Sequence, residues 1–188
     1  YYLLRITNYY NLTIVWNTWL LVILIMSLSS YPIHTLLPTD PLFPSSLFSV
    51  KPTVKQLYYR GTWRPDIFDQ SLAIVGSRRF TRYGHQAVDL FLPDIISRHI
   101  TTISGFMYGI DTLIHQSTID LAGTTVAILG NGLDILYPVE NGPLYSNILD
   151  SGGLIISEYP PDLKPALYTF PQRNRLVAAL ASLGVLLI

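Results

Sequence analysis

The chain has 188 residues, of which 49% are hydrophobic and 13% are charged, and it contains no cysteine. This composition excludes an intrinsically disordered tail, a disulfide-stabilised scaffold and a cysteine-rich zinc module. Twelve basic residues balance twelve acidic residues, so the net charge gives no overall attraction to nucleic acid or membrane. Any electrostatic binding site must therefore be local.

The N-terminal segment, residues 1–30, differs from the rest because Arg5 is its only charged residue. Residues 12–28 are mostly apolar and approach the roughly 20 residues that a membrane helix needs. The first methionine of the chain is Met26, so the part ahead of it is equally well explained as a cloning or gene-model artefact. The sequence leaves both explanations open.

Charge is strongly segregated along the chain. Residues 51–82, which begin within a lead-in segment at 31–70, contain seven basic and two acidic residues, a net charge of plus five. Residues 83–170 contain two basic and nine acidic residues, a net charge of minus seven. Basic blocks of this kind are more often solvated surface than a polyanion site, so their position in the fold decides between the two.

From residue 71 onward, short apolar runs alternate with helical patterns. The run SerLeuAlaIleValGly at 71–76 is typical of a buried parallel strand, and apolar residues from Val88 to Ile96 recur at helical spacing. Pro93 lies inside that helix, so we expect a kink or break near Leu92. The same alternation predicts strands at 101–104, 125–130, 154–157 and 185–188, and helices at 110–121, 141–150 and 172–182.

Five alternations of strand and helix predict an α/β fold, a Rossmann-like three-layer domain with a mainly parallel sheet, over residues 71–188. The final run, 185–188, stops within a strand, so we expect a domain that is truncated at the C-terminus. In the usual strand order the first strand is central and the fourth lies beside it. The loops after these two strands would then meet at the crevice where such folds bind ligands.

Two basic groups follow those strands. Arg78, Arg79 and Arg82 follow the first strand, and Arg173 and Arg175 follow the fourth. Their convergence predicts an anion site, in which Arg78 offers a bidentate fork and the backbone amides of Gly76 and Ser77 face a phosphate. Aromatic rings interleaved with cations suit single-stranded nucleic acid, although each ring alone more often packs than stacks a base. The rings near these strand ends are Phe80, Tyr83, Phe106, Tyr108 and Tyr137.

Carboxylates are expected at the same edge. Asp111, Asp134 and Glu158 each follow a predicted strand, which makes a magnesium site or acid–base chemistry conceivable. Helix capping and pairing with arginine are the stronger interpretation. Literal tests for a dinucleotide fingerprint, a P-loop and hydrolase motifs fail, since Ile135 stands where the third fingerprint glycine belongs. The four histidines, at 34, 85, 99 and 115, show no metal-ligand spacing.

Five motifs in order resemble the DNA-processing protein A (DprA/Smf) family. They include GlySerArg within residues 73–84, SerGlyPheMetTyrGlyIleAsp within 104–115 and GlyAsnGlyLeuAsp within 128–138. SerGluTyrProPro at 157–161 and ArgAsnArg within 170–181 complete the series. The resemblance spans roughly residues 31–188, and five ordered motifs are far more specific than any one of them.

This resemblance implies a cytoplasmic protein that binds and protects single-stranded DNA during natural transformation and helps load the RecA recombinase. It implies no catalysis, no cofactor and a homodimer. The candidate DNA-binding residues, combined from the crevice and the family motifs, are Gly76, Ser77, Arg78, Arg79, Arg82, Gly105, Arg173 and Arg175. By the resemblance, Arg78 is the foremost DNA contact, whereas Arg173 and Arg175 either contact DNA or brace the crevice.

Two other functions remain open from the sequence. One is a nucleotide-processing enzyme of the lysine-decarboxylase-like group, a nucleoside monophosphate phosphoribohydrolase that would use Glu158 or Asp111; the absence of its glycine-rich phosphate loop weighs against it. The other is a module attached to a membrane by residues 12–28. Locating the mature N-terminus would test that alternative.

Overall fold

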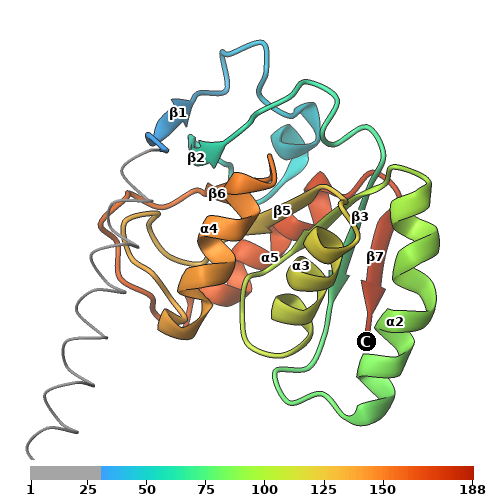
Figure 1. Cartoon of the computed structure of the whole chain (residues 1–188). Helices are drawn as coiled ribbons and strands as arrows, with labels where there is room; N and C mark the ends of the chain where they lie inside the picture. The colour runs from blue at the N-terminus through green and yellow to red at the C-terminus, as the bar shows by residue number, and fades with distance from the viewer. Residues whose placement is uncertain (1–30) are drawn as a thin grey trace, which may run out of the picture. The chain divides into compact units, whose positions relative to one another are not determined.

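The computed structural model describes residues 31–188, and the apolar segment at 1–30 lies outside the described residues. Within the described part, seven strands form one sheet that carries helices on both faces (Figure 1). No helix among residues 31–188 is long and apolar enough to cross a membrane. The predicted α/β fold with a mainly parallel sheet is confirmed.

The elements follow the predicted alternation closely. The strands are β1 (His34–Leu36), β2 (Leu57–Gly61), β3 (Ser71–Val75), β4 (Thr101–Ser104), β5 (Thr125–Ile128), β6 (Leu154–Ser157) and β7 (Gly184–Leu187). The helices are α2 (Arg82–Ser97), α3 (Ile110–Asp120), α4 (Gly142–Asp150) and α5 (Thr169–Leu180), with short 3-10 helices η1 (Ser45–Ser49) and η2 (Val139–Asn141).

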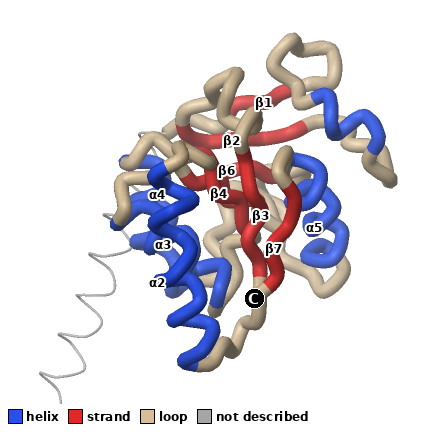
Figure 2. Tube along the Cα trace, turned by 90° about the vertical axis from the view of Figure 1, so that its right-hand side faces the viewer, coloured by secondary structure: helices blue, strands red, loops and turns tan. Residues whose placement is uncertain are grey.

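The strand order differs from the expected one. The sheet runs β1-β2-β6-β5-β4-β3-β7, so the fourth parallel strand, β6, lies beside β5, and β7 takes the place beside β3. The reason lies in the crossovers: α2, α3 and α4 cover one face, and each right-handed crossover moves the chain one strand in the same direction. Helix α5 then returns the chain across the opposite face to β7 (Figure 2).

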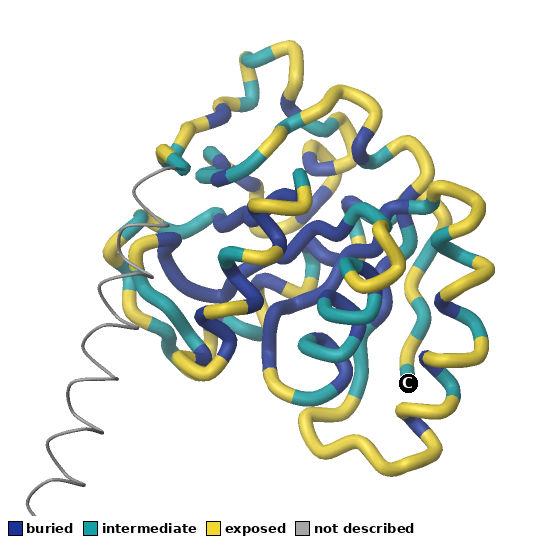
Figure 3. Tube along the Cα trace, viewed as in Figure 1, coloured by how far each residue is buried: buried dark blue, intermediate teal, exposed yellow. Residues whose placement is uncertain are grey.

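The core is built on both faces of the central strands. On the α5 side, Leu176, Val177 and Leu180 pack with sheet residues such as Ile103 and Val126. On the other side, a separate cluster joins β3 to the inner faces of α2 and α3: Ile74, Val88, Leu92, Ile110 and Ile114. Figure 3 shows this burial concentrated in the sheet, whereas the loop that leads into α2 is exposed.

Helix α2 runs continuously through Pro93, so of the kink or break expected near Leu92 the break does not occur. Proline removes the hydrogen bond to the carbonyl of Asp89, one turn earlier. Both Pro93 and Asp89 are exposed, and water can satisfy that carbonyl on the outer face of the helix. The buried face, which contains Val88 and Leu92, keeps the helix on the sheet.

The lead-in segment also joins the sheet, which the sequence did not predict. Strand β2 pairs antiparallel with β6, and β1 pairs antiparallel with β2. Leu47, Val54 and Leu57 of this segment are buried in the α5-side core. The lead-in therefore shares its hydrophobic core with the parallel part of the sheet.

Candidate nucleic-acid interface

The carboxyl ends of β3 to β6 bring four loops to one edge of the sheet. A cavity of about 480 Å³ opens there, and Gly76, Arg78, Tyr137, Phe170 and Arg173 are among its lining residues. The Arg78 guanidinium carbon lies 5.8 Å from the centre of the Phe170 ring, within cation–π range. The predicted convergence of Arg78 and Arg173 therefore occurs, although the strand order that motivated it was wrong. Helix α5 brings Arg173 there across the opposite face of the sheet.

Arg173 is a buried structural group at the floor of this cavity. Its side chain is 4% exposed, and its guanidinium donates to the carbonyl oxygens of Gly105 and Ile128, at the ends of β4 and β5. Burial lowers the pKa of Arg173 to about 10, and the nearby Asp111 opposes this effect. Because its N–H groups are occupied by carbonyl oxygens of the protein, Arg173 contributes positive electrostatic potential to the cavity but offers no free bidentate donor to a ligand.

Gly105 and Asp111 complete this buried centre. A Cβ at Gly105 would lie 2.5 Å from a guanidinium nitrogen of Arg173 and 2.6 Å from Asp111 Oδ2, so only glycine fits. The Met107 N–H donates to Asp111 Oδ2 at 3.2 Å. Burial raises the pKa of Asp111, while Arg173 acts against that rise. Gly105 therefore makes room for the arginine, and Asp111 balances its charge.

The loop after β3 has the opposite character. Arg78, Arg79 and Arg82 are exposed, and within residues 31–188 neither Arg79 nor Arg82 has a side-chain partner. The turn itself is held by Gly109, whose φ is +85° and whose Cβ, if present, would lie 2.2 Å from Ser77 O. Ile110 N–H also donates to Ser77 O at 3.1 Å. The turn thus presents three exposed arginines whose guanidinium N–H groups have no hydrogen-bond partner within residues 31–188, with Arg78 packed against the Phe170 ring.

The backbone amides of this loop do not face outward, which corrects the sequence-based expectation. The Ser77 N–H donates to Ile188 O at 3.2 Å, and the amide of Gly76 lies towards the Asp111 carboxylate. A Cβ at Gly76 would approach Ile188 O to 2.3 Å. The chain packs so tightly behind the turn that its amides find partners within the protein. Phosphate binding here depends on the arginine side chains.

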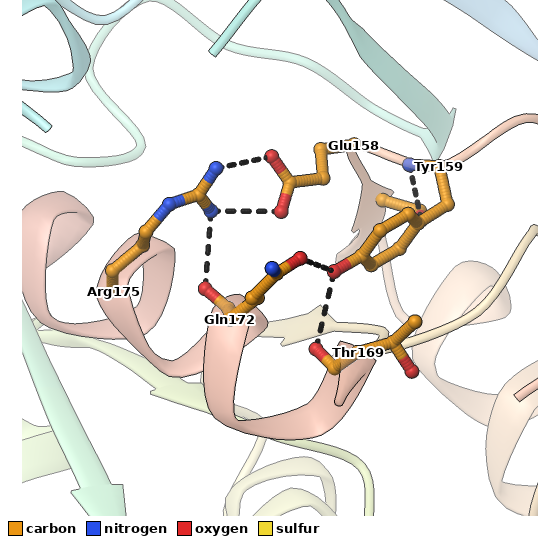
Figure 4. A network of polar contacts seen from close by, with 6 residues as sticks. Glu158, Tyr159, Thr169, Gln172 and Arg175 are labelled. Atoms are coloured by element: carbon orange, nitrogen blue, oxygen red, sulfur yellow. Dashed lines mark hydrogen bonds and ion pairs between the residues drawn. The ribbon is translucent and has the colours of Figure 1, made fainter. Parts of the chain in front are cut away.

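Arg175 does not line this cavity, whose open side we term the mouth. Its guanidinium binds Glu158 in a bidentate pair with distances of 2.7 and 2.6 Å (Figure 4). The side chains of Arg175 and Glu158 are 18% and 12% exposed. The expectation that Glu158 pairs with an arginine is confirmed, whereas Arg175 offers no free charge to a ligand.

The aromatic side chains expected near these strand ends also differ in their exposure to solvent. Phe106 is 1% exposed and packs edge-on against Tyr145, so its ring is closed to a nucleobase. Tyr83 and Phe80 are 78% and 38% exposed beside the arginines. Tyr108, 39% exposed, donates to Glu140 at 2.9 Å, which joins two loops of the mouth.

The carboxylates expected at this edge of the sheet have partners within the protein. Asp134 pairs with Arg60 at 2.7 Å, and Glu158 and Asp111 are engaged as described above. Within residues 31–188, no three histidine or acidic side chains gather to hold a metal ion. Glu158 and Asp111, either of which the phosphoribohydrolase alternative would use, thus each have internal partners.

His115, whose position the sequence left open, lies wholly buried below the mouth. Its Nδ1 shares a 2.7 Å hydrogen bond with Thr125 Oγ1, and its ring packs against Phe106. Burial lowers the pKa of His115 to about 3, and Arg173 adds to that effect. The histidine is therefore a neutral core residue.

Comparison with known proteins gives consistent results. The model of the DNA recombination-mediator protein A family matches residues 34–188. Protein Smf of Escherichia coli is 35% identical over 158 residues, which cover 84% of this chain and 42% of that protein. DNA processing protein DprA of Bacillus subtilis is 30% identical over 156 residues, covering 83% of this chain and 52% of that protein. The chain spans about half or less of the length of these curated relatives.

Two solved structures share the fold. The X-ray structure of DNA processing protein A from Streptococcus pneumoniae matches with a TM-score of 0.72 at 31% identity, covering 84% of this chain and 53% of that chain. DNA processing protein A from Helicobacter pylori, whose structure concerns a unique single-stranded DNA binding mode, also gives a TM-score of 0.72, at 28% identity. That match covers 84% of this chain and 69% of the other.

Proposed function

The chain belongs to the DNA recombination-mediator protein A family, and from this premise we propose that it binds single-stranded DNA at the edge of the sheet where Arg78 lies. The observation that carries the proposal is the exposed group of Arg78, Arg79 and Arg82, whose guanidinium N–H groups have no partner within residues 31–188, with Arg78 lining the cavity that Arg173 floors. The relative from Helicobacter pylori binds single-stranded DNA, which supports the same class of ligand.

The chemistry of the mouth favours a single strand over a duplex. The exposed guanidinium groups of Arg78, Arg79 and Arg82 can contact phosphates. Tyr83 and Phe80 offer exposed ring surface in a second cavity, which Arg79 also lines. Stacking of a base on such a ring contributes about 1–3 kcal/mol whatever the base. In a duplex the bases are paired and stacked inside, so these rings would add nothing. Binding is therefore expected to be tolerant of sequence and weaker for duplex DNA.

The proposal assigns no catalytic step to this chain. The remaining candidate residues take different parts in it: Arg78, Arg79 and Arg82 contact phosphate, with the Ser77 hydroxyl beside them, while Gly76, Gly105 and Arg173 shape the mouth. Protection of DNA in transformation, loading of RecA, a homodimer and a cytoplasmic location are further parts of the proposal, supported by family membership.

The test is a salt titration of oligothymidine binding to the full chain. Each phosphate contact on a single strand contributes about 0.7 to the slope of log K against log salt. Arg78→Ala is expected to weaken binding roughly tenfold, the value of one charge-assisted hydrogen bond. It is also expected to reduce the slope by about 0.7.

Arg98→Ala is the matched control, because Arg98 is an exposed arginine at the end of α2, on the opposite edge of the sheet. Its binding line should coincide with that of the unaltered chain. If Arg78→Ala and Arg98→Ala behave alike, the proposed site is wrong. A RecA-loading assay on the same variants tests the wider role, since loading should be lost in parallel with DNA affinity.

A further inference from the structure

The bidentate pair between Arg175 and Glu158 lies between the two ends of a loop that forms one wall of the mouth. Glu158 directly follows β6, and Arg175 lies in the second turn of α5. Residues 158–168, which connect β6 to α5, form a proline-rich loop that we term the wall loop. Closing a bidentate bridge across this loop fixes the distance between its ends.

Further contacts strengthen this closure. The Tyr159 hydroxyl donates to Thr169 O at 3.2 Å and to Gln172 Oε1 at 3.3 Å, as Figure 4 shows. Arg175 also donates to Gln172 O at 3.0 Å. The N-terminal end of the wall loop is therefore tied to the first two turns of α5, with which its C-terminal end is continuous in the chain.

The middle of the wall loop rests on the loop after β5. Gly132 N–H donates to Leu163 O at 2.8 Å, and Asp134 N–H donates to Pro161 O at 2.9 Å. Its far end supplies Leu167, which lines the same cavity as Arg78 and is 94% exposed. Phe170, under the Arg78 guanidinium, follows in the first turn of α5. The position of this wall thus depends on the pair at its base.

Granted the DNA-binding function proposed above, we propose that Arg175 and Glu158 are positioning residues that hold the wall loop in its binding geometry without touching DNA. Arg175 has no free fork, because both terminal nitrogens are engaged by Glu158 and one also by Gln172. Releasing it towards a phosphate would leave Glu158, at 12% exposure, without its counter-charge. The same arginine type thus acts on DNA directly at Arg78 and indirectly at Arg175.

The experiment compares salt titrations of oligothymidine binding for Arg175→Ala, Glu158→Gln and Arg78→Ala, with Arg98→Ala as control, in the full chain below its unfolding temperature. For Arg175→Ala and Glu158→Gln we expect affinity to fall about tenfold at every salt concentration, since one or two wall side chains must then be ordered during binding. Their slopes should match that of the unaltered chain. Only Arg78→Ala should lose about 0.7 of slope.

A second readout reports on the loop itself. Chymotrypsin should cut the wall loop after Leu167 or Tyr168 faster in both pair variants than in Arg78→Ala. If Arg175→Ala fails to fold, Glu158→Gln, which preserves the side-chain shape, supports the test alone. A slope reduced by about 0.7 in Arg175→Ala, or a steeper slope with tighter binding in Glu158→Gln, would show a phosphate contact at Arg175 and overturn the proposal. Unchanged affinity in both would overturn it as well, whereas an inert Arg78→Ala would count against the DNA site instead.

Discussion

Two groups of arginines meet at one edge of the sheet and differ in almost every physical respect. Arg78, Arg79 and Arg82 lie before and at the start of α2, are exposed, and have guanidinium N–H groups without a hydrogen-bond partner in the described part of the chain. Those of α5, Arg173 and Arg175, are withdrawn from solvent and committed to carbonyls and a carboxylate. An arginine close to the mouth is therefore a candidate ligand contact only if its guanidinium N–H groups are not already bonded within the protein.

Removal of the buried arginine is expected to have the largest effect on stability. Arg173→Ala would leave the carbonyls of Gly105 and Ile128 without their donor and Asp111 without its counter-charge. Loss of one partner from a buried charged network costs about 3–5 kcal/mol. We expect the free energy of unfolding in urea to fall by that amount, with Arg79→Ala as the control that changes it by less than about 0.5 kcal/mol. Equal stability of the two variants would contradict the buried role.

A change of pH probes the same buried region through His115. Because burial lowers the pKa of His115 to about 3, the unfolded chain takes up this proton as the pH falls below about 6.5, whereas the folded chain does not. The stability contribution is therefore complete above pH 6.5 and declines towards pH 3. The expected loss approaches about 1.4 kcal/mol per pH unit well below pH 6.5 and amounts to roughly 2 kcal/mol between pH 6.5 and 4.5.

His115→Gln removes this titration while keeping a polar group near Thr125. Its unfolding free energy, measured by urea denaturation over the same pH range, should decline less steeply than that of the unaltered chain. Parallel pH profiles for the two proteins would mean that His115 titrates normally in the fold.

Gly109 links the exposed arginines to the rigid part of the fold. Gly109→Ala would place a Cβ 2.2 Å from Ser77 O in a backbone conformation with φ at +85°. Backbone strain of this kind costs about 1–3 kcal/mol. We expect a loss of about 2 kcal/mol in urea unfolding together with weaker DNA binding, because the turn that presents Arg78 must shift. A variant with unchanged DNA affinity would show that the turn needs no such support.

The sequence predicted the elements of this fold well and their order less well. Apolar runs such as 71–76 and 125–130 are bounded by glycine and identify strands without tertiary information. Strand order depends on which face each crossover covers, and the pattern of α5 does not distinguish one face from the other. The strands of the lead-in are three and five residues long, and β1 has only one buried residue, so their periodicity is too weak to detect.

The site residues show the same limit. GlySerArg at 76–78 identified the exposed turn, but the sequence left open whether Arg173 and Arg175 contact DNA or brace the crevice. Their partners, the Gly105 carbonyl and Glu158, lie 68 and 17 residues away along the chain. Pairing of Glu158 with an arginine could be predicted, because Glu158 follows a buried strand, where an unpaired carboxylate would be costly, but the sequence did not identify which arginine.

Substitution of the exposed arginines Arg79 and Arg82 is expected to have the smallest effects. Arg79→Ala and Arg82→Ala each remove one guanidinium group that has free donors. Each should weaken oligothymidine binding by about 0.5–1 kcal/mol and lower the salt slope by about 0.7 or less, without a change in unfolding free energy. Additive losses in the double variant would indicate two independent phosphate contacts. Slopes equal to that of the unaltered chain would place the DNA path on the other side of Arg78.

The most direct measurement is a crystal structure of the full chain with a short oligothymidine. We expect a phosphate within hydrogen-bonding distance of the Arg78 guanidinium, with Arg175 still paired to Glu158 and Arg173 still bound to the Gly105 carbonyl. A strand bound at the opposite edge of the sheet, near Arg98, or a phosphate held by a released Arg175, would contradict this expectation.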